Sequence, residues 1–452
     1  MSLATGKRLF ILAVMVAAWL ITTASAESKA RIVRLSDVQG GVQMDRGGGQ
    51  GFEKAFLNMP LIEGTKLKTS SSGRAEVEFE DGSTLRIVSD SEVNFTALSL
   101  GDDGQKVNTI ELVDGTAYVN VRPKKGDRFT LNFGHESATL TEPAHFRVDL
   151  DVTDATVAVF NGNVHVTGRA GDVQVATKHS VTFDLGNNDK YAEKKGFDEM
   201  PYDKWDTQQS EYQNRYASNN VYGINSPYTY GLSDLAYYGS YSMLPGCGWG
   251  WQPYFMDANW NPFMDGAWTW YPGSGYMWVS AYPWGWMPYM YGNWAYGPGC
   301  GWYWQPGYWG GWNGVPRVVN PPRRIHVPMP PVRTQQTVMV GHGLTAYPAS
   351  GIPRHLSIAP GSVGLAVPRG SVSNLDRVAK EMGTSPHPVA VNTEAEARRA
   401  AAPPAPPMSA GPWGRGVSSG AAPGRSGAPR ESAPVRMPAP AHTPPPSARP
   451  PR

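Results

Sequence analysis

Apolar and polar positions alternate along short segments between residues 30 and 186. In residues 74–80, three apolar side chains share one face of a strand and three glutamates share the other. The dipeptide Asp81-Gly82 separates this segment from a second strand-like run at 83–88, which predicts a hairpin with a glycine-bearing turn. We expect the glutamate stripe to be a solvated strand face in preference to an acid/base site. Its members are Glu76, Glu78 and Glu80.

Further segments of the same kind follow, and helical periodicity is absent among them. Many short strands with frequent turns predict an all-β sandwich, barrel or solenoid, which we assign to residues 27–190. The expected strands cover residues 117–121, 129–133, 145–150, 156–160, 164–167, 173–177 and 181–185. The expected turns lie at Gly40-Gly41, Asp114-Gly115, Asn161-Gly162 and Gly171-Asp172.

A polar stretch at residues 201–220 has helical spacing instead. Trp205, Tyr212 and Tyr216 fall on one narrow stripe, with Pro201 near the start and Gly223 past the end. We therefore expect a helical connector at residues 191–222. The helix would either dock on the preceding sheet, which we favour, or bind a partner.

Residues 223–316 hold a tandem repeat rich in Trp, Gly and Pro. Eleven positions of one unit recur 26 residues later, nine of them with the same residue. A weaker copy precedes them, so three units of 26–27 residues stand in a row. Each unit is long enough for one hairpin and short enough to need its neighbours for burial.

The aromatic side chains of this block allow two interpretations. They either fill the core of small repeat units or form an exposed platform that stacks on sugar rings or peptides. Nucleic acid is disfavoured as a partner, because residues 221–316 contain no Lys or Arg to meet phosphate. The platform candidates are Trp260, Trp268, Trp270, Trp278, Trp286, Trp294, Tyr296 and Trp304.

Cys247 and Cys300 are the two cysteines of the chain, and each follows a Pro-Gly pair in a repeat unit. An open row of hairpins would separate them by about four strands, roughly 19 Å, which is too far for a disulfide. If the repeats close or fold back, the two residues can meet. We hypothesise that they form a disulfide in an oxidising compartment, whereas a metal pair is disfavoured because the block has no histidine.

Charge divides the chain into an acidic body and a basic tail. Residues 317–452 contain sixteen Lys and Arg and five Asp and Glu. This region is rich in Pro, Ala and Arg, and we expect it to be largely disordered, with polyproline at 403–407 and 444–451 and one short helix at 373–383. The tail could contact anionic wall polymer, lipid headgroups or nucleic acid, or it could serve as a solubilising linker with no fixed partner.

The first residues predict export. Lys7-Arg8 precedes an apolar run at residues 9–21, and Ala24-Ser25-Ala26 provides a small-x-small cleavage site. We expect a signal peptide at residues 1–26 and a periplasmic, outer-envelope or extracellular location. The alternative is an uncleaved N-terminal anchor.

Two short motifs recur in the β region. Leu112-x-x-Gly115-x-x-x-Val119 returns as Val159-x-x-Gly162-x-x-x-Val166, and with Gly64-Thr65-x-Leu67-x-Thr69 these motifs resemble the FecR domain. The resemblance implies an all-β, solenoid-like periplasmic domain. In FecR proteins of iron uptake that domain senses an outer-membrane receptor and signals to a cytoplasmic sigma factor.

This chain departs from that pattern in two places. Eight residues precede the apolar run, too few for a sigma-binding arm, and residues 143–148 replace the family's Gly-Thr-x-Phe-x-Val. The repeat block in turn resembles a Trp/Gly/Tyr-rich domain of unknown function that often follows FecR-like domains.

Motifs of catalysis and cofactor binding are missing from the sequence, including nucleophile elbows, phosphate loops and zinc-type Cys or His pairs. Asp149, Asp151 and Asp154 could touch calcium, but a solvated hairpin end is favoured. We therefore expect no enzyme, metal or cofactor. The leading hypothesis is an envelope binding or scaffold protein that engages cell-wall polymer, polysaccharide or an envelope protein. The alternatives are a FecR-type signalling module without a sigma-binding arm and, more weakly, a wall-glycan enzyme.

Overall fold

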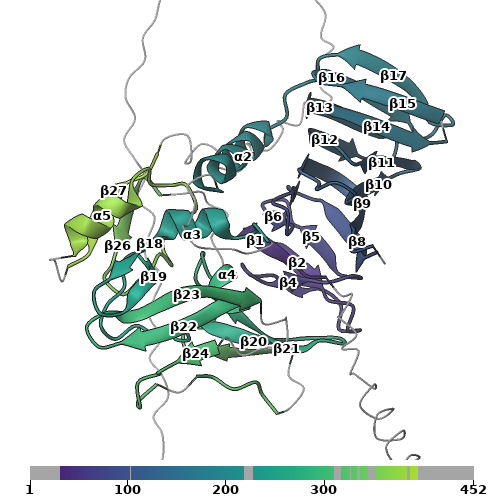
Figure 1. Ribbon diagram of the computed structural model, residues 1–452. Coiled ribbons are helices and arrows are strands. Elements are labelled where there is room, and N and C mark those ends of the chain that lie inside the picture. Colours follow the sequence, from purple (N-terminus) through teal and green to yellow (C-terminus); the bar gives the residue numbers. More distant parts are fainter. Residues whose placement is uncertain are drawn as a thin grey trace, which may run out of the picture. The chain divides into compact units, whose positions relative to one another are not determined.

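The computed structural model describes residues 31–101, 103–169, 171–217, 228–309, 317–325, 327–332, 336–344, 353–383 and 387–394 (Figure 1). The expected signal segment and polyproline stretches lie outside these ranges. Within the described ranges, every helix is too short or too polar to traverse a lipid bilayer. The expected mainly β fold is confirmed.

Residues 33–195 form two sheets that share the long strand β9, and all pairings are antiparallel except β9–β10. The first sheet has the order β3 (Glu53–Lys54), β2 (Val42–Asp45), β5 (Lys66–Thr69), β8 (Glu92–Leu100), β9 (Lys106–Val121), β10 (Arg128–Phe133), β11 (Glu136–Leu140), β14 (Asn163–Gly168) and β15 (Gly171–Ala176). The second has the order β4 (Pro60–Leu61), β1 (Val33–Gln39), β6 (Arg74–Glu78), β7 (Thr84–Ile87), β9, β12 (Ala144–Leu150), β13 (Asp154–Asn161), β16 (His179–Asp184) and β17 (Lys190–Lys195).

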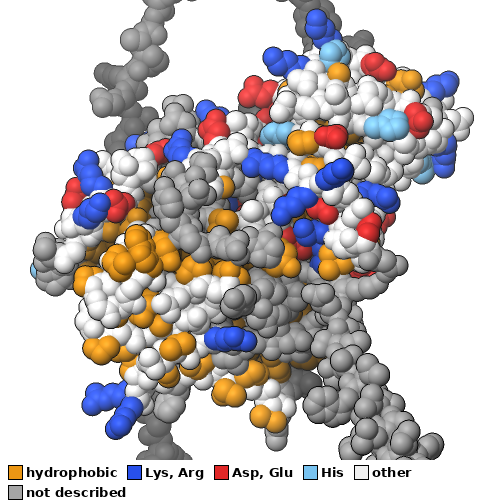
Figure 2. Space-filling view, viewed as in Figure 1, with side chains coloured by type: hydrophobic (Ala, Val, Ile, Leu, Met, Phe, Trp, Pro, Cys, Tyr) orange, Lys and Arg blue, Asp and Glu red, His pale blue; other side chains and the backbone are white. Residues whose placement is uncertain are grey.

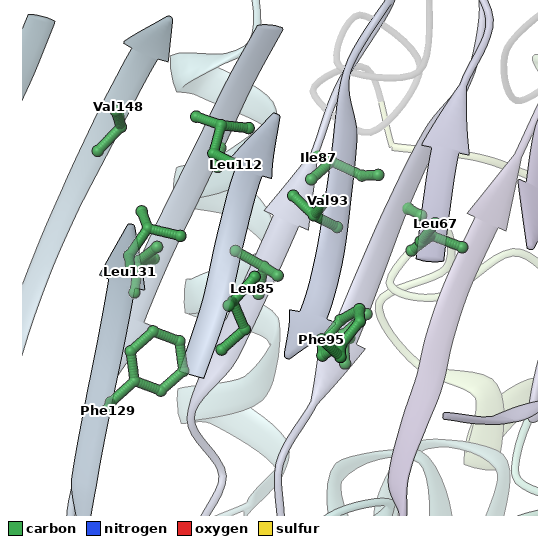
Figure 3. Packing of buried hydrophobic residues seen from close by; sticks show 14 of the residues in the cluster. Leu67, Leu85, Ile87, Val93, Phe95, Leu112, Phe129, Leu131 and Val148 are labelled. Carbon is green, nitrogen blue, oxygen red and sulfur yellow. The ribbon is translucent and has the colours of Figure 1, made fainter. Parts of the chain in front are cut away.

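The core lies between these two sheets. Figure 3 shows Leu67, Phe95 and Leu131 of the first sheet and Leu85 and Val148 of the second in one layer of side chains. All five are almost fully buried. Alternation along each strand therefore sends one set of side chains into a shared apolar layer, as the sequence pattern predicts.

Two dipeptides expected to be turns are instead corners where the chain passes between sheets. Strand β9 pairs with β8 up to Asp114 and with β12 from Gly115, and β13 and β14 join different sheets on either side of Gly162. Both glycines have positive φ, 86° and 83°. A Cβ would lie 2.6 Å from the Asp90 carbonyl at Gly115 and 2.6 Å from the Pro143 carbonyl at Gly162. The recurring motif thus marks a corner that only glycine fits.

Helix α2 (Asp203–Ala217) confirms the expected helix and covers the outer face of the second sheet. The helix's own Trp205 and Tyr212 are buried on its inner side. Tyr118 of β9 donates a hydrogen bond to Asp203 at the start of the helix. The helix therefore docks on the preceding sheet, as favoured from the sequence. Strand β17 shows that the sheet extends past the expected boundary at residue 190.

Each repeat unit of the Trp-rich block forms one hairpin, and the block also contains the helices α3 (Leu232–Tyr238) and α4 (Met287–Met290). The first and third hairpins share a sheet, whereas the second forms another. The five-stranded sheet of the block has the order β18 (Gly239–Leu244), β19 (Gly248–Pro253), β23 (Gly301–Trp309), β22 (Tyr291–Gly297) and β24 (Arg317–Val319). The other has the order β21 (Gly275–Ser280), β20 (Gly266–Tyr271) and β25 (Thr337–Val340).

Each of the three hairpins contains the same local arrangement, a cross-strand aromatic pair whose Trp ring packs against a glycine. The second strand of each hairpin carries a Trp, at positions 251, 278 and 304, that pairs across the strands with an aromatic residue at 241, 268 or 294. The ring of that Trp lies against a glycine at the start of the first strand. A Cβ at Gly239 would lie 2.3 Å from Trp251, and a Cβ at Gly266 would lie 2.6 Å from Trp278. The glycines of the repeat therefore make room for the rings.

Part of the Pro/Ala/Arg-rich tail is folded, at residues 353–383 and 387–394. Strands β26 (His355–Ile358) and β27 (Val389–Asn392) pair, and the expected short helix is α5 (Leu375–Met382). Leu356, Ile358 and Val367 are buried in one cluster with the tryptophans. These aliphatic residues are sparse in the local sequence, and only the aromatic block supplies the surface that buries them.

Substitution of Gly266 by Ala tests the arrangement of Trp and glycine in the hairpins. The new methyl group would meet the Trp278 ring at 2.6 Å, so we expect a loss of about 1–3 kcal/mol in the free energy of unfolding, measured by chemical denaturation. The matched control is Gly186→Ala, where the nearest atom, Asp184 Oδ1, is 3.5 Å away, and a change within about 0.5 kcal/mol is expected. Equal effects of the two variants would contradict this account.

Candidate functional site

The outer face of the second sheet carries a row of charged side chains that are buried. Arg34 of β1, Glu76 and Glu78 of β6 and Arg86 of β7 are each at most 4% exposed. The expectation that the glutamate stripe is solvated is therefore wrong. Helices α2 and α3 and the segment around Arg369 cover this face, and strand alternation alone carries no information about what covers a polar face.

Glu76 lies at the centre of an ion network that joins distant parts of the chain. Arg86 Nε is 2.7 Å from Glu76 Oε2, and Arg369 Nη1 is 2.6 Å from Glu76 Oε1. Ser36 donates a further hydrogen bond of 2.7 Å to the same carboxylate. Because the two guanidinium groups come from β7 and from the C-terminal region, one carboxylate joins the β sheet to a segment almost 300 residues away.

The same arginines bind the carboxylates of the two covering helices. Arg86 Nη1 is 2.6 Å from Asp206 of α2, and Arg369 Nη2 is 2.9 Å from Asp234 of α3. Arg34 Nη1 is also 2.6 Å from Asp234 and 3.2 Å from Glu78. Each arginine therefore bridges two acids, and the cluster links the second sheet, both helices and the C-terminal segment.

Electrostatics separates the two central glutamates. Burial raises the pKa of Glu76, but the charges of Arg86 and Arg369 outweigh that effect and hold it at about 2. Burial raises the pKa of Glu78 to about 7, because Arg34 lowers it too little and the carboxylate of Asp234 adds to the rise. Glu76 is thus ionised at neutral pH, whereas Glu78 exchanges its proton near neutral pH.

The outer face continues uncovered over β12, β13, β16 and β17. There it forms an open hollow of about 400 Å³, lined mainly by hydroxyl-bearing and charged side chains with Phe197 and Met200 at one side. Thr156 and Thr182 share a hydrogen bond of 2.8 Å across the strands, and Arg147 donates to Asp149 at 2.7 Å. The hollow offers hydrogen-bonding groups of both charge signs. The other lining residues are Ser180, Ala192, Glu193, Lys194 and Asp198.

The hairpin end next to this face resembles a capped turn. Asp149 also accepts a hydrogen bond from Thr116, and Asp151 accepts backbone hydrogen bonds from Thr153 and Asp154. Across the described ranges, no group of three or more His, Cys, Asp or Glu could hold a metal ion.

The structure places most of the platform candidates in the core. Six of them are at most 3% exposed, and their rings pack in aromatic clusters; the Trp260 and Trp294 centroids are 5.7 Å apart, and the Trp286 ring packs on Tyr230 with centroids 5.3 Å apart. The platform hypothesis is wrong for these six, because cross-strand pairing and the contact between hairpins turn the rings inward. They are Trp260, Trp268, Trp278, Trp286, Trp294 and Trp304. Trp270 and Tyr296 are half-buried.

An exposed tryptophan lies elsewhere, in the first hairpin, and stacks on a partly buried tyrosine. Trp249 is 52% exposed and stacks on Tyr241 with centroids 5.7 Å apart. The repeat pattern did not single out this pair, because Trp249 has no tryptophan counterpart in the second unit, where Tyr276 stands one residue after the turn glycine.

Cys247 and Cys300 form a disulfide at the turns of the first and third hairpins, with Cα atoms 6.6 Å apart. The open-row arrangement does not apply, because β19 pairs with β23 while the second hairpin belongs to another sheet. The two equivalent turns are thereby brought to one end of the shared sheet.

Family models match two separate regions of the chain. A model described as FecR protein matches residues 65–165, and one described as Family of unknown function (DUF6600) matches residues 232–324. The chain thus contains a FecR region followed by a region of a family whose function is unknown, as the sequence motifs indicated. No curated protein matches the chain.

Among solved structures, two crystal structures described as those of a putative anti-sigma factor from Parabacteroides distasonis are similar to part of the chain. The first is 16% identical, covers 29% of this chain and 59% of that protein, and has a TM-score of 0.26. The second is 14% identical, covers 36% of this chain and 74% of that protein, and also has a TM-score of 0.26.

Removal of the Arg369 guanidinium tests the ion network. Arg369→Met leaves Glu76 and Asp234 buried with one cation fewer, so we expect a loss of about 3–5 kcal/mol in unfolding free energy near pH 7. The control is Arg377→Met, in the same segment, whose side chain is 75% exposed and pairs with Glu381 within one helix. That change is expected to cost about 0.5 kcal/mol or less. Similar losses in both variants would refute a structural role for the network.

Glu78 predicts a particular pH dependence. Its folded pKa of about 7 lies above its ordinary value of 4.5, so its contribution to stability is complete below pH 4.5 and is lost as the pH rises through 7. Glu78→Gln should flatten the stability profile between these values and make the protein more stable than the native chain at pH 8, by ~3 kcal/mol at most. Glu193→Gln, on exposed β17, is the control. Parallel profiles for the native chain and Glu78→Gln, from denaturation at a series of pH values, would show that the proton is not held there.

Proposed function

We propose that this chain is an exported, non-catalytic module of the bacterial envelope that acts in signalling of the FecR type, through contact with another protein. The FecR region at residues 65–165 is the observation that carries the proposal. The N-terminal charged and apolar segments support export to the envelope, and the proposal requires no metal, cofactor or covalent chemistry.

Engagement of cell-wall polymer or polysaccharide, our first hypothesis from the sequence, loses its main support. It required a platform of exposed rings, and six of the eight candidates are buried in the core. Stacking on a sugar needs an accessible ring face, and the faces of these six buried rings are not accessible to a ligand. The signalling alternative does not depend on them.

We further propose that the partner protein binds the uncovered part of the second sheet. The hollow over β12, β13, β16 and β17 combines hydrogen-bonding groups with the apolar side chains of Phe197 and Met200, a mixture that is common in protein interfaces. Addition of a partner strand at the sheet edge is disfavoured, because four of the six exposed residues of β17 are charged and three of those are lysines.

Site-specific photo-crosslinking in intact cells tests this proposal. A photoreactive residue at Ala192, which is exposed and lines the hollow, should capture a defined envelope protein. The same residue at His165, exposed on β14 of the first sheet, is the matched control and should not capture it. Deletion of the gene should also change the transcription of a set of envelope genes.

Two outcomes would contradict the proposal. One is capture that is equal from Ala192 and His165, because it would show that the hollow is not a specific surface. The other is an unchanged transcriptome together with retention of the protein on purified wall material, which would restore the polymer-binding hypothesis.

A further inference from the structure

Residues 317–325 and 327–329, which we call the β24 segment, lie along the edge of a sheet of the Trp-rich block. Strand β24 pairs in parallel with β22, with Trp294 opposite Val318. Val318, Ile325 and Val327 pack against the aromatic core. These three side chains fix the inner side of the segment.

The outer side of the β24 segment is both basic and apolar. Arg317 and Val319 alternate with the inward Val318, and both are exposed. A turn closed by the hydrogen bond from Ile325 N to Pro322 O puts the exposed Arg323 and Arg324 at its two central positions. Beyond the turn, Met329 is 74% exposed, and Val319 is 43% exposed. Three guanidinium groups thus flank apolar side chains that no part of the described chain covers.

No carboxylate is available nearby in the sequence to neutralise these arginines. Residues 266–375 contain no Asp or Glu, and the preceding acid, Asp265, is buried and bonded to His342. In Figure 2, orange and blue side chains, and none in red, lie over the region that β20 to β24 occupy in Figure 1. Charged side chains of both signs gather instead over the two-sheet domain and around α5.

We propose that the β24 segment binds the surface of a membrane that contains anionic phospholipid. Its arginines would contact headgroup phosphates, because guanidinium groups pair with phosphate oxygens in a bidentate manner. Val319 and Met329 would enter the boundary between headgroups and acyl chains, as apolar side chains of peripheral proteins do. The apolar side chains distinguish this occupant from a soluble anionic polymer, which would need the arginines alone. The proposal is independent of the signalling role.

Vesicle co-sedimentation of the full-length chain tests the proposal. Vesicles of phosphatidylcholine alone are compared with vesicles that also contain phosphatidylglycerol, at low and high salt. The native chain should bind the anionic vesicles and release them as salt screens the charges. The variant Arg317→Glu/Arg323→Glu/Arg324→Glu should bind about a hundredfold more weakly or worse, because each basic residue near such a surface strengthens binding about fivefold.

Two further variants make the result specific to the segment. Lys190→Glu/Lys194→Glu/Lys195→Glu makes the same charge change on exposed β17 and should bind like the native chain. Val319→Ser/Met329→Ser keeps every charge and should bind about tenfold more weakly. All variants share the same N-terminal apolar run and basic C-terminal stretch, so differences between them report on the β24 segment.

Three results would overturn the proposal. The first is unchanged binding of the arginine variant, and the second is an equal loss in the β17 variant, which would indicate a general charge effect. The third is a loss in the arginine variant with none in Val319→Ser/Met329→Ser, which would assign the segment to a soluble polyanion. Thermal unfolding of each variant, whose changes are all at exposed positions, establishes that it is folded.

Discussion

The ion network around Glu76 is the interaction on which the arrangement of this protein depends. A carboxylate that is fully buried is stable only if cations and hydrogen-bond donors replace the water it has lost. Here those cations come from β7 and from residue 369, and the same arginines hold Asp206 and Asp234 of the covering helices. The two-sheet domain, the helices and the C-terminal segment therefore cannot separate without exposing or stranding buried charge.

Aromatic packing provides the second constraint. Three copies of one hairpin supply three cross-strand aromatic pairs, and a glycine beside each ring leaves the space for it. The hairpins do not stack as an open row, because the first and third share a sheet and the second forms another. The C-terminal segment then adds aliphatic side chains such as Ile358 and Val367 to the same cluster. The aromatic core of the Trp-rich block is poor in aliphatic residues, and the C-terminal segment completes it. The composition of that segment, considered alone, predicts disorder.

These two constraints change where function can be located. The repeat pattern indicated its tryptophans as candidate binding residues, but most of those candidates are buried and pack in the core. Two surfaces of the described residues that remain free are the uncovered polar hollow of the second sheet and the basic, apolar outer side of the β24 segment. Both surfaces are defined by which side chains the folded chain leaves exposed, and neither corresponds to a motif in the sequence.

Local patterns in the sequence determined the mainly β domain, helix α2, the helix at residues 375–382 and the hairpin repeat, because strand alternation, helical stripes and glycine-bearing turns act over a few residues. They did not determine that Asp114-Gly115 and Asn161-Gly162 are corners between sheets, because a corner differs from a turn only in what the flanking strands pair with. Nor could they show that Glu76 is buried, since its partners Arg86 and Arg369 are 10 and 293 residues away. Tertiary structure alone decided which polar face is covered and which aromatic rings are core, because burial depends on neighbours that the chain brings together only when it folds.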